Sequence, residues 1–199
     1  EEDINTACRR ILEAKYKLGL FSNPYRYCNA KRNKTDIYSA ENRQIARDVA
    51  AETFVLLKNE GNLLPLKKQG KIALIGPLAD TRNNIAGTWS VAQAPEKYTT
   101  IKEAMEKALD GKATLLYAQG SNIWRDRELQ KNGEQGKSIA WGDKVKMKNE
   151  ALQIAKEADV IVCAMGETAD MSGECASRTN LEMPDVQQEL LAELAKMGK

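Results

Sequence analysis

The sequence predicts an α/β fold, a mostly parallel sheet sandwiched by helices. Three short, continuously apolar runs rich in Ile, Val and Leu are typical of buried strands: 71–76, 113–118 and 158–166. Helical patterns lie between and after them, at 101–109, 146–158 and from Pro184 onward. Strands that alternate with helices in this way are joined by right-handed crossovers, so we expect parallel strands with helices on both faces.

Two further helices are predicted before the sheet. Apolar residues at three- or four-residue steps give the first helix, over 2–18, a single stripe: Ile4, Ala7, Ile11, Ala14 and Leu18. Ser39 is a plausible N-cap for the second, which we expect to run through Leu57 and stop near Gly61. Nothing before the first stripe can cover it, so we interpret this helix as the tail of a larger upstream domain. We expect three parts along the chain. Residues 1–27 form that tail and the start of a linker, 28–70 form the linker and a leading helix, and 71–199 form a sandwich domain truncated at its C-terminus.

Composition excludes several classes of function. The 199 residues include 30 basic and 28 acidic side chains, scattered without a basic block, so we expect no nucleic-acid partner. No apolar run approaches the roughly 20 residues of a membrane span, and the first residues do not resemble a signal peptide. The four cysteines show no C-x-x-C spacing and read as ordinary free thiols, and no phosphate-binding glycine motif occurs. We expect no membrane partner, no metal and no cofactor.

The chain contains no histidine, which removes the usual general base of Ser and Cys hydrolases. Proton chemistry would therefore fall to carboxylates or lysines. Two long connections, 77–98 and 167–184, follow the first and third predicted strands, and open α/β sheets place ligand crevices at these carboxyl ends. A third stretch, 121–143, is polar and Gly-rich, and we interpret it as a surface insertion without chemistry.

The second connection holds three acids and an arginine within a dozen residues: Glu167, Asp170, Glu174 and Arg178. Such a loop can carry a mobile carboxylate into a cleft, while the arginine holds another acid charged. The alternative is a solvated acidic loop. In the first connection, Trp89 offers a flat apolar surface on which a sugar ring can stack, although an isolated tryptophan can also serve only to pack a loop.

Several segments together resemble one family. They are KYKLGLFSNPYR, VAAETFVLLKNEGNLLPL, KIALIGPLAD, GTWS and GETADMSGECASRTNLEMP, in this order along nearly the whole chain. This series is similar to bacterial family 3 glycoside hydrolases of the periplasmic β-glucosidase type. The resemblance implies an upstream (β/α)₈-like barrel that bears an aspartate nucleophile, followed by an α/β sandwich whose loops reach over the barrel mouth. The helix over 2–18 is similar to the barrel's closing helix.

The resemblance also implies roles for single residues. The family's Ser-Gly-Glu pattern makes Glu174 the general acid/base, with Glu167 as the runner-up, and Trp89 and Arg178 are the expected substrate-binding residues. A retaining glycosidase needs two carboxyl groups about 5 Å apart, and only the second could lie in this chain. We therefore expect the chain alone to be inactive.

The expected whole protein is a retaining β-glucosidase, periplasmic or secreted, whose partners are a β-linked oligosaccharide or glucoside and the chain's own missing barrel domain. One alternative is a catalytically inactive carbohydrate-binding or scaffold module of the same family. Another is an independent flavodoxin-like domain that binds a nucleotide or flavin.

Overall fold

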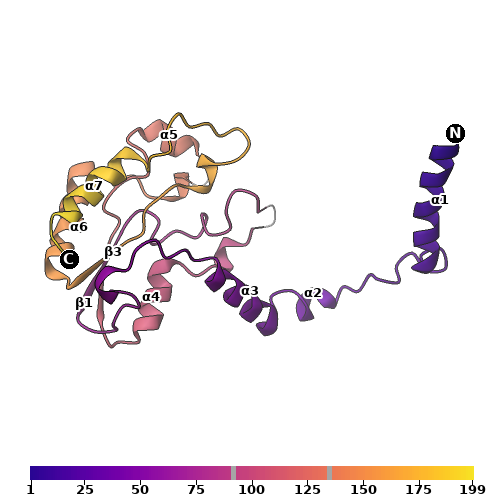
Figure 1. Cartoon of the computed structure of the whole chain (residues 1–199), viewed down its shortest axis with the longest axis horizontal. Helices are drawn as coiled ribbons and strands as arrows, with labels where there is room; N and C mark the ends of the chain where they lie inside the picture. Colours follow the sequence, from indigo (N-terminus) through magenta and orange to yellow (C-terminus); the bar gives the residue numbers. More distant parts are fainter. Residues whose placement is uncertain (91–92, 134–135) are drawn as a thin grey trace. The chain divides into compact units, whose positions relative to one another are not determined.

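The structure is a computed structural model that describes residues 1–90, 93–133 and 136–199. The chain divides into two compact units, Glu1–Leu63 and Leu64–Lys199. The first unit contains the helices α1 (Glu2–Lys17), α2 (Arg32–Thr35) and α3 (Ala40–Glu52), as Figure 1 shows. A short 3₁₀ turn at Glu60–Asn62 follows them.

Helix α1 forms where the apolar stripe predicts it, but the stripe remains open to solvent. Ile4 is 67% exposed and Ile11 is 61% exposed. Apolar side chains at these positions gain stability only when another surface covers them. Within the described residues of its unit, α1 buries none of its own side chains.

Helix α3 begins as predicted and ends earlier. The Ser39 hydroxyl accepts a hydrogen bond from the Asn42 N–H at 3.1 Å, which confirms the N-cap. The helix stops at Glu52, so the predicted extension to Gly61 is wrong. The next residues are the apolar run Phe54–Val55–Leu56–Leu57, each at least 64% exposed. Four consecutive apolar residues cannot share one face of a helix, and Phe and Val are weak helix formers.

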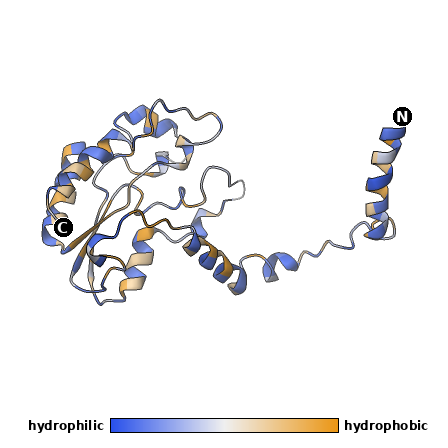
Figure 2. Cartoon of the chain, viewed as in Figure 1, coloured by the Kyte–Doolittle hydropathy of each residue, from blue (hydrophilic) through white to orange (hydrophobic). Residues whose placement is uncertain are grey.

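The second unit is built on a three-stranded sheet. The strands are β1 (Lys71–Ile75), β2 (Thr114–Ala118) and β3 (Val160–Cys163), in the order β2-β1-β3, and both pairings are parallel. The predicted strands and their parallel arrangement are thereby confirmed. Figure 2 shows β1 and β3 in the hydrophobic colour. The central strand, β1, is the most buried of the three, since its four residues after Lys71 are at most 2% exposed.

Helices cover both faces of this sheet, as predicted. They are α4 (Ile101–Leu109), α6 (Lys144–Glu157) and α7 (Asp185–Ala195), with the short α5 (Arg127–Asn132) outside the sheet crossovers. Short 3₁₀ turns lie at Pro95–Lys97, Gly136–Ser138 and Ala169–Met171.

The two faces differ in what covers them. On one face, Ala73 and Ile75 of β1 pack with Ala151 of α6 and with Leu190 and Leu194 of α7. On the other, α4 approaches β2, and the Lys102 ammonium lies 4.9 Å from the centre of the Tyr117 ring. The first crossover runs from β1 to β2, and the second runs back from β2 past β1 to β3. Because the two run in opposite directions across the sheet, equal handedness places α4 and α6 on opposite faces (Figure 1).

The stretch 121–143 is not the surface insertion that its polar composition predicts. Its Ile123 and Ile139 are buried, and they form a second small core with Met171 from the loop after β3. Inside this core the Gln130 amide accepts a hydrogen bond from the Ile123 N–H at 3.0 Å and donates one to the Ile139 carbonyl at 2.9 Å. A satisfied amide can be buried at little cost, which composition alone does not reveal.

Within the described ranges, no helix combines the length and apolar character that a membrane crossing requires. The same residues contain no group of three or more His, Cys, Asp or Glu side chains arranged to hold a metal ion.

Candidate active site

Two loops meet at the carboxyl ends of β1 and β3. The first, residues 77–98, is here called the tryptophan loop, and 91–92 within it lie outside the described residues; the second, 167–184, is called the carboxylate loop. The Thr88 hydroxyl donates a hydrogen bond to the Ala169 carbonyl, and the Ala169 N–H donates one to Asn84 Oδ1 at 3.0 Å. The predicted meeting of the two loops at one edge of the sheet is therefore confirmed.

Trp89 reaches across to the carboxylate loop at Gly173. A Cβ built on this glycine would lie 3.2 Å from Cζ2 of Trp89 and 2.6 Å from Cγ2 of Thr88. Gly173 also has a φ of +98°, so both its backbone conformation and its neighbours require a residue without a side chain. The indole is 69% exposed, which leaves it accessible to a ligand beside the loop.

Glu174 follows Gly173 directly and is exposed to solvent. Cys175 on its other side has a φ of +61°, a left-handed conformation that is uncommon for a residue with a side chain. Backbone strain of this kind concentrates at functional sites. Among the described residues, no hydrogen bond or ion pair engages the Glu174 carboxylate. Its position therefore leaves it available to an incoming group.

Glu167, by contrast, is already engaged. Its carboxylate pairs with the guanidinium of Arg178, whose side chain is only 17% exposed. Arg178 also donates to Asn180 Oδ1 at 3.3 Å and to the Glu182 carbonyl. The sequence predicted that the arginine would hold one acid of this loop, and the structure identifies that acid as Glu167.

The arginine also faces a residue of the 121–143 stretch. Its guanidinium carbon lies 5.8 Å from the ring centre of Trp124, within range of a cation–π interaction. Arg178 thus joins the start of the carboxylate loop to its end and to a neighbouring segment. These contacts make it a support of the loop.

Asp170, another acid of the loop, lies against Gly133. Its Oδ2 would lie 1.9 Å from a Cβ built on Gly133, and its Oδ1 is buried without a hydrogen bond among the described residues. The carboxylate therefore faces the 121–143 stretch. Of the three acids at 167, 170 and 174, Glu174 is therefore the one that is exposed and unpaired within the described residues.

Gln187 holds the base of the carboxylate loop, and sequence reasoning missed it. The side chain is fully buried on α7. It accepts a hydrogen bond from the Gly166 N–H at 2.9 Å and donates one to the Gly166 carbonyl at 2.8 Å. Glu167 is the next residue. A signal was present, because Gln187 stands at a core position of the stripe that Leu190 and Leu194 continue.

The base of the tryptophan loop is held by charges. Burial raises the pKa of Asp80, but hydrogen bonds from Lys102 and Thr100, both at 3.0 Å, outweigh it and leave the pKa below its usual value. Arg82 forms a two-pronged ion pair with Glu103 of α4. Both loops that carry candidate residues are thus anchored at their stems and exposed at their tips.

Comparison with known proteins identifies the family to which the chain is similar. Residues 54–199 match the glycosyl hydrolase family 3 C-terminal domain. A periplasmic beta-glucosidase of Salmonella typhimurium is 38% identical over 99% of this chain and 26% of that protein. A beta-xylosidase of Formosa agariphila is 31% identical over 98% of this chain and 25% of that protein.

Solved structures agree with the fold. A beta-glucosidase involved in saponin metabolism from intestinal bacteria matches with a TM-score of 0.78 and 29% identity, over 98% of this chain and 28% of that one. A beta-glucosidase from Listeria innocua in complex with gluconolactone matches with a TM-score of 0.73 and 29% identity, over 96% and 23%. The chain thus spans about a quarter of the length of these relatives. It belongs to glycosyl hydrolase family 3.

Proposed function

We propose that the whole protein hydrolyses terminal β-D-glucosyl or related residues with retention, and that this chain supplies the general acid/base, Glu174. Relatives that match nearly all of this chain are named as beta-glucosidases and a beta-xylosidase. One of them is named as periplasmic, and we propose a periplasmic or secreted location on that ground.

The observation that carries this proposal is the contrast between two glutamates of one loop. Glu174 is exposed and directly follows Gly173, which lies against the indole of Trp89, whereas Glu167 pairs with Arg178. A general acid must carry a proton before it reacts, and a guanidinium neighbour favours the carboxylate that has lost one. The pairing supports Glu174 as the acid and Glu167 as part of the loop's framework.

The chemistry divides between two carboxyl groups. In a retaining glycosidase one carboxylate attacks the anomeric carbon, while the second group protonates the departing oxygen and later takes a proton from water. We assign the second role to Glu174 and the first to an aspartate of the barrel domain that the family resemblance implies. Trp89 then offers its exposed indole to the leaving-group sugar.

Arg178 acts in this scheme by holding the loop. Its side chain is mostly buried and engaged by Glu167, Asn180 and Glu182. The role of Arg178 in contacting substrate stays a prediction.

The test is the variant Glu174→Gln in the whole protein, compared on two β-glucosides. A substrate with a poor leaving group needs the proton, and its turnover should fall by roughly 10²-fold or more. The dinitrophenolate of a dinitrophenyl glucoside departs without protonation, so the glycosylation rate on this substrate should fall much less. Wild-type rates on the poor leaving group would rule out the assignment.

The matched control is Glu167→Gln. It removes the partner of Arg178, and we expect losses of similar size on both substrates, because a displaced loop affects both reactions. A loss confined to the poor leaving group would transfer the acid role to Glu167.

Azide gives a second readout. When the acid/base of a retaining enzyme is removed, a small anion can occupy its place and attack the covalent intermediate from the same face. For Glu174→Ala we expect azide to accelerate turnover and to yield the β-glucosyl azide.

The chain alone should not hydrolyse an aryl β-glucoside, since it supplies half of the catalytic pair. A whole protein that binds saccharides without hydrolysing them would instead identify a carbohydrate-binding member of the family.

A further inference from the structure

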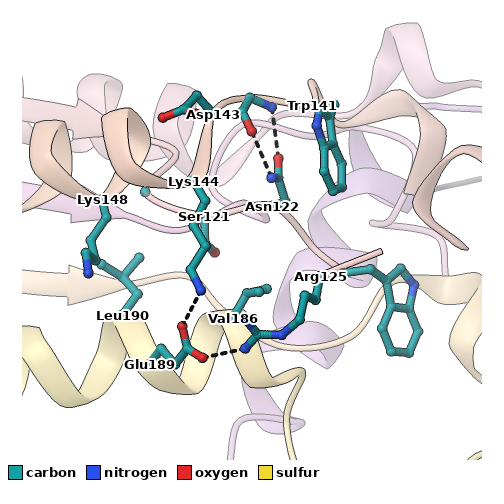
Figure 3. A pocket seen from close by; sticks show the side chains of 13 residues that line it. Ser121, Asn122, Arg125, Trp141, Asp143, Lys144, Lys148, Val186, Glu189 and Leu190 are labelled. Atoms are coloured by element: carbon teal, nitrogen blue, oxygen red, sulfur yellow. Dashed lines mark hydrogen bonds and ion pairs between the residues drawn. The ribbon is translucent and has the colours of Figure 1, made fainter. Parts of the chain in front are cut away.

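A cavity in the Leu64–Lys199 unit lies outside the two loops of the candidate active site. Its volume is about 230 Å³, and it opens where β2 ends, against the first turns of α6 and α7 (Figure 3). None of the four predicted site residues lines it. Its wall includes Ser121, Arg125, Trp141, Lys144 and Glu189.

One wall of this cavity is shared with the carboxylate loop. Trp124 and Arg125 line it, and they also line a separate cavity of about 410 Å³ that contains Arg178. The pocket in Figure 3 is therefore a neighbour of the candidate active site and is distinct from it.

Ser121 supplies a buried hydrogen-bonding group without a partner. The residue is 6% exposed, and its hydroxyl makes no hydrogen bond within the described part of the chain. Buried hydroxyls are normally paired, because the loss of water is otherwise uncompensated. The Oγ itself is closed off from solvent, so a ligand hydroxyl in the cavity that Ser121 lines would pair with it after the serine side chain turns to another staggered rotamer.

The cavity is lined by three cations, Arg125, Lys144 and Lys148, and by the carboxylates of Asp143 and Glu189; Lys148 forms no ion pair within the described part of the chain. Glu189 accepts from Lys144 at 2.9 Å and pairs with Arg125, which also bonds Asp185 at 2.6 Å. Hydrogen bonds from Lys144 and Arg125 lower the pKa of the Glu189 carboxyl to about 2. The carboxylate thus remains ionised at ordinary pH and neutralises the cations beside it, which favours a neutral polar ligand over an inorganic anion.

Trp141 adds an apolar wall. The indole is 38% exposed, and the adjacent Gly142 backbone is fixed by Asn122, which exchanges two hydrogen bonds with it at 3.0 and 2.9 Å. Val186 and Leu190 contribute further apolar surface (Figure 3). An indole beside fixed polar groups suits a sugar ring, whose C–H face stacks while its hydroxyls are hydrogen-bonded.

We propose that this pocket binds one pyranose unit, as a saccharide site separate from the catalytic carboxylate. The volume is below the roughly 300 Å³ at which pockets for drug-sized ligands begin, which restricts the ligand to a single ring. The choice of a saccharide among neutral polyols rests on the proposed function.

The experiment follows the indole N–H signals of the ¹⁵N-labelled chain during titration with methyl β-D-glucoside. The chain has three tryptophans, and Trp141→Phe identifies the signal of Trp141 by its loss. We expect that signal to shift saturably. Ser121→Ala should weaken the titration roughly fivefold, as loss of one hydrogen bond predicts. It should not lower the thermal midpoint, because it deletes an unpaired buried hydroxyl.

Trp89→Phe is the matched control, and the Trp141 titration should be unchanged in it. Inorganic phosphate at equal concentration should leave the Trp141 signal in place. A shift with phosphate and none with the glucoside would overturn the proposal in favour of an anion site. A glucoside that moves only the Trp89 signal, or none, would also overturn it.

Failure here is separable from failure of the proposed function. In the whole protein, Glu174→Gln should lose turnover while the site at Trp141 still binds the glucoside. Ser121→Ala should keep wild-type turnover on an aryl β-glucoside. A loss of turnover in Ser121→Ala as large as that in Glu174→Gln would contradict a binding site separate from the catalytic one.

Discussion

The Gln187 side chain offers a sharp test of how the carboxylate loop is held. Gln187→Met keeps the length of the side chain and removes its donor and acceptor. Two hydrogen bonds to Gly166, at 2.8 and 2.9 Å, are lost, and both peptide groups are left in a partly buried site. An unpaired buried polar group costs about 1–3 kcal/mol. Because water partly reaches Gly166, we expect a loss of about 2–4 kcal/mol in the free energy of unfolding.

The measurement is urea unfolding of the chain followed by circular dichroism. Gln153→Met is the matched control, since Gln153 lies exposed on α6 and bonds Glu157 at 3.2 Å. The control should stay within about 0.5 kcal/mol of wild type. If Gln187→Met lowers the free energy of unfolding no more than this control does, the two hydrogen bonds to Gly166 do not stabilise the chain.

Gln187→Glu adds a test by pH. The protonated form of the introduced carboxyl can donate to the Gly166 carbonyl, whereas the ionised form places a negative charge against it. Burial and this bond raise the pKa of the introduced group above its unfolded value of about 4.3. The variant should therefore be closest to wild type at low pH and lose stability as pH rises through the raised pKa. A stability difference that does not change with pH would refute this reasoning.

Three further predictions concern stability. Leu190→Ala should cost about 2–5 kcal/mol, because Leu190 is 1% exposed in the core beneath α6 and α7. Thr100→Ala should cost about 1 kcal/mol, since it removes half of the reciprocal capping box of α4. Hydrogen bonds from Lys144 and Arg125 hold the Glu189 pKa at about 2, so its contribution is present above its usual value near 4.5 and lost as pH falls toward 2. The side chain is 47% exposed, and solvent screening limits this contribution to less than about 1 kcal/mol.

Controls for these three variants lie on the same elements. Leu191→Ala, at 40% exposure on α7, should cost much less than Leu190→Ala, and equal costs would contradict the assigned core. Thr100→Ser should retain most of the α4 cap, because Ser also caps well. In Glu189→Gln the urea midpoint should fall less between pH 4.5 and 2 than it does in wild type. An equal fall in both would mean that other carboxyl groups cause this pH dependence.

Local patterns in the chain determined the strands and most helices of the second unit. Continuous apolar runs predicted the three strands, and the helical pattern over 101–109 and the Pro184 signal marked the starts of α4 and α7. Alternation of strands and helices predicted the parallel sheet, since crossover handedness follows from chirality. Position after a strand, together with the family resemblance, singled out Glu174.

Only the tertiary structure decided which residues pair across the chain. The end of α3 at Glu52 and the buried core in 121–143 were missed, because a composition window does not show which side chains find distant partners. The same limit applies to the site. The sequence shows two candidate glutamates, Glu167 and Glu174, and an arginine in one loop, but which of them pairs with the arginine depends on the path of the backbone. Folding brings Arg178 to Glu167 and leaves Glu174 exposed next to Gly173, the residue that lies against Trp89.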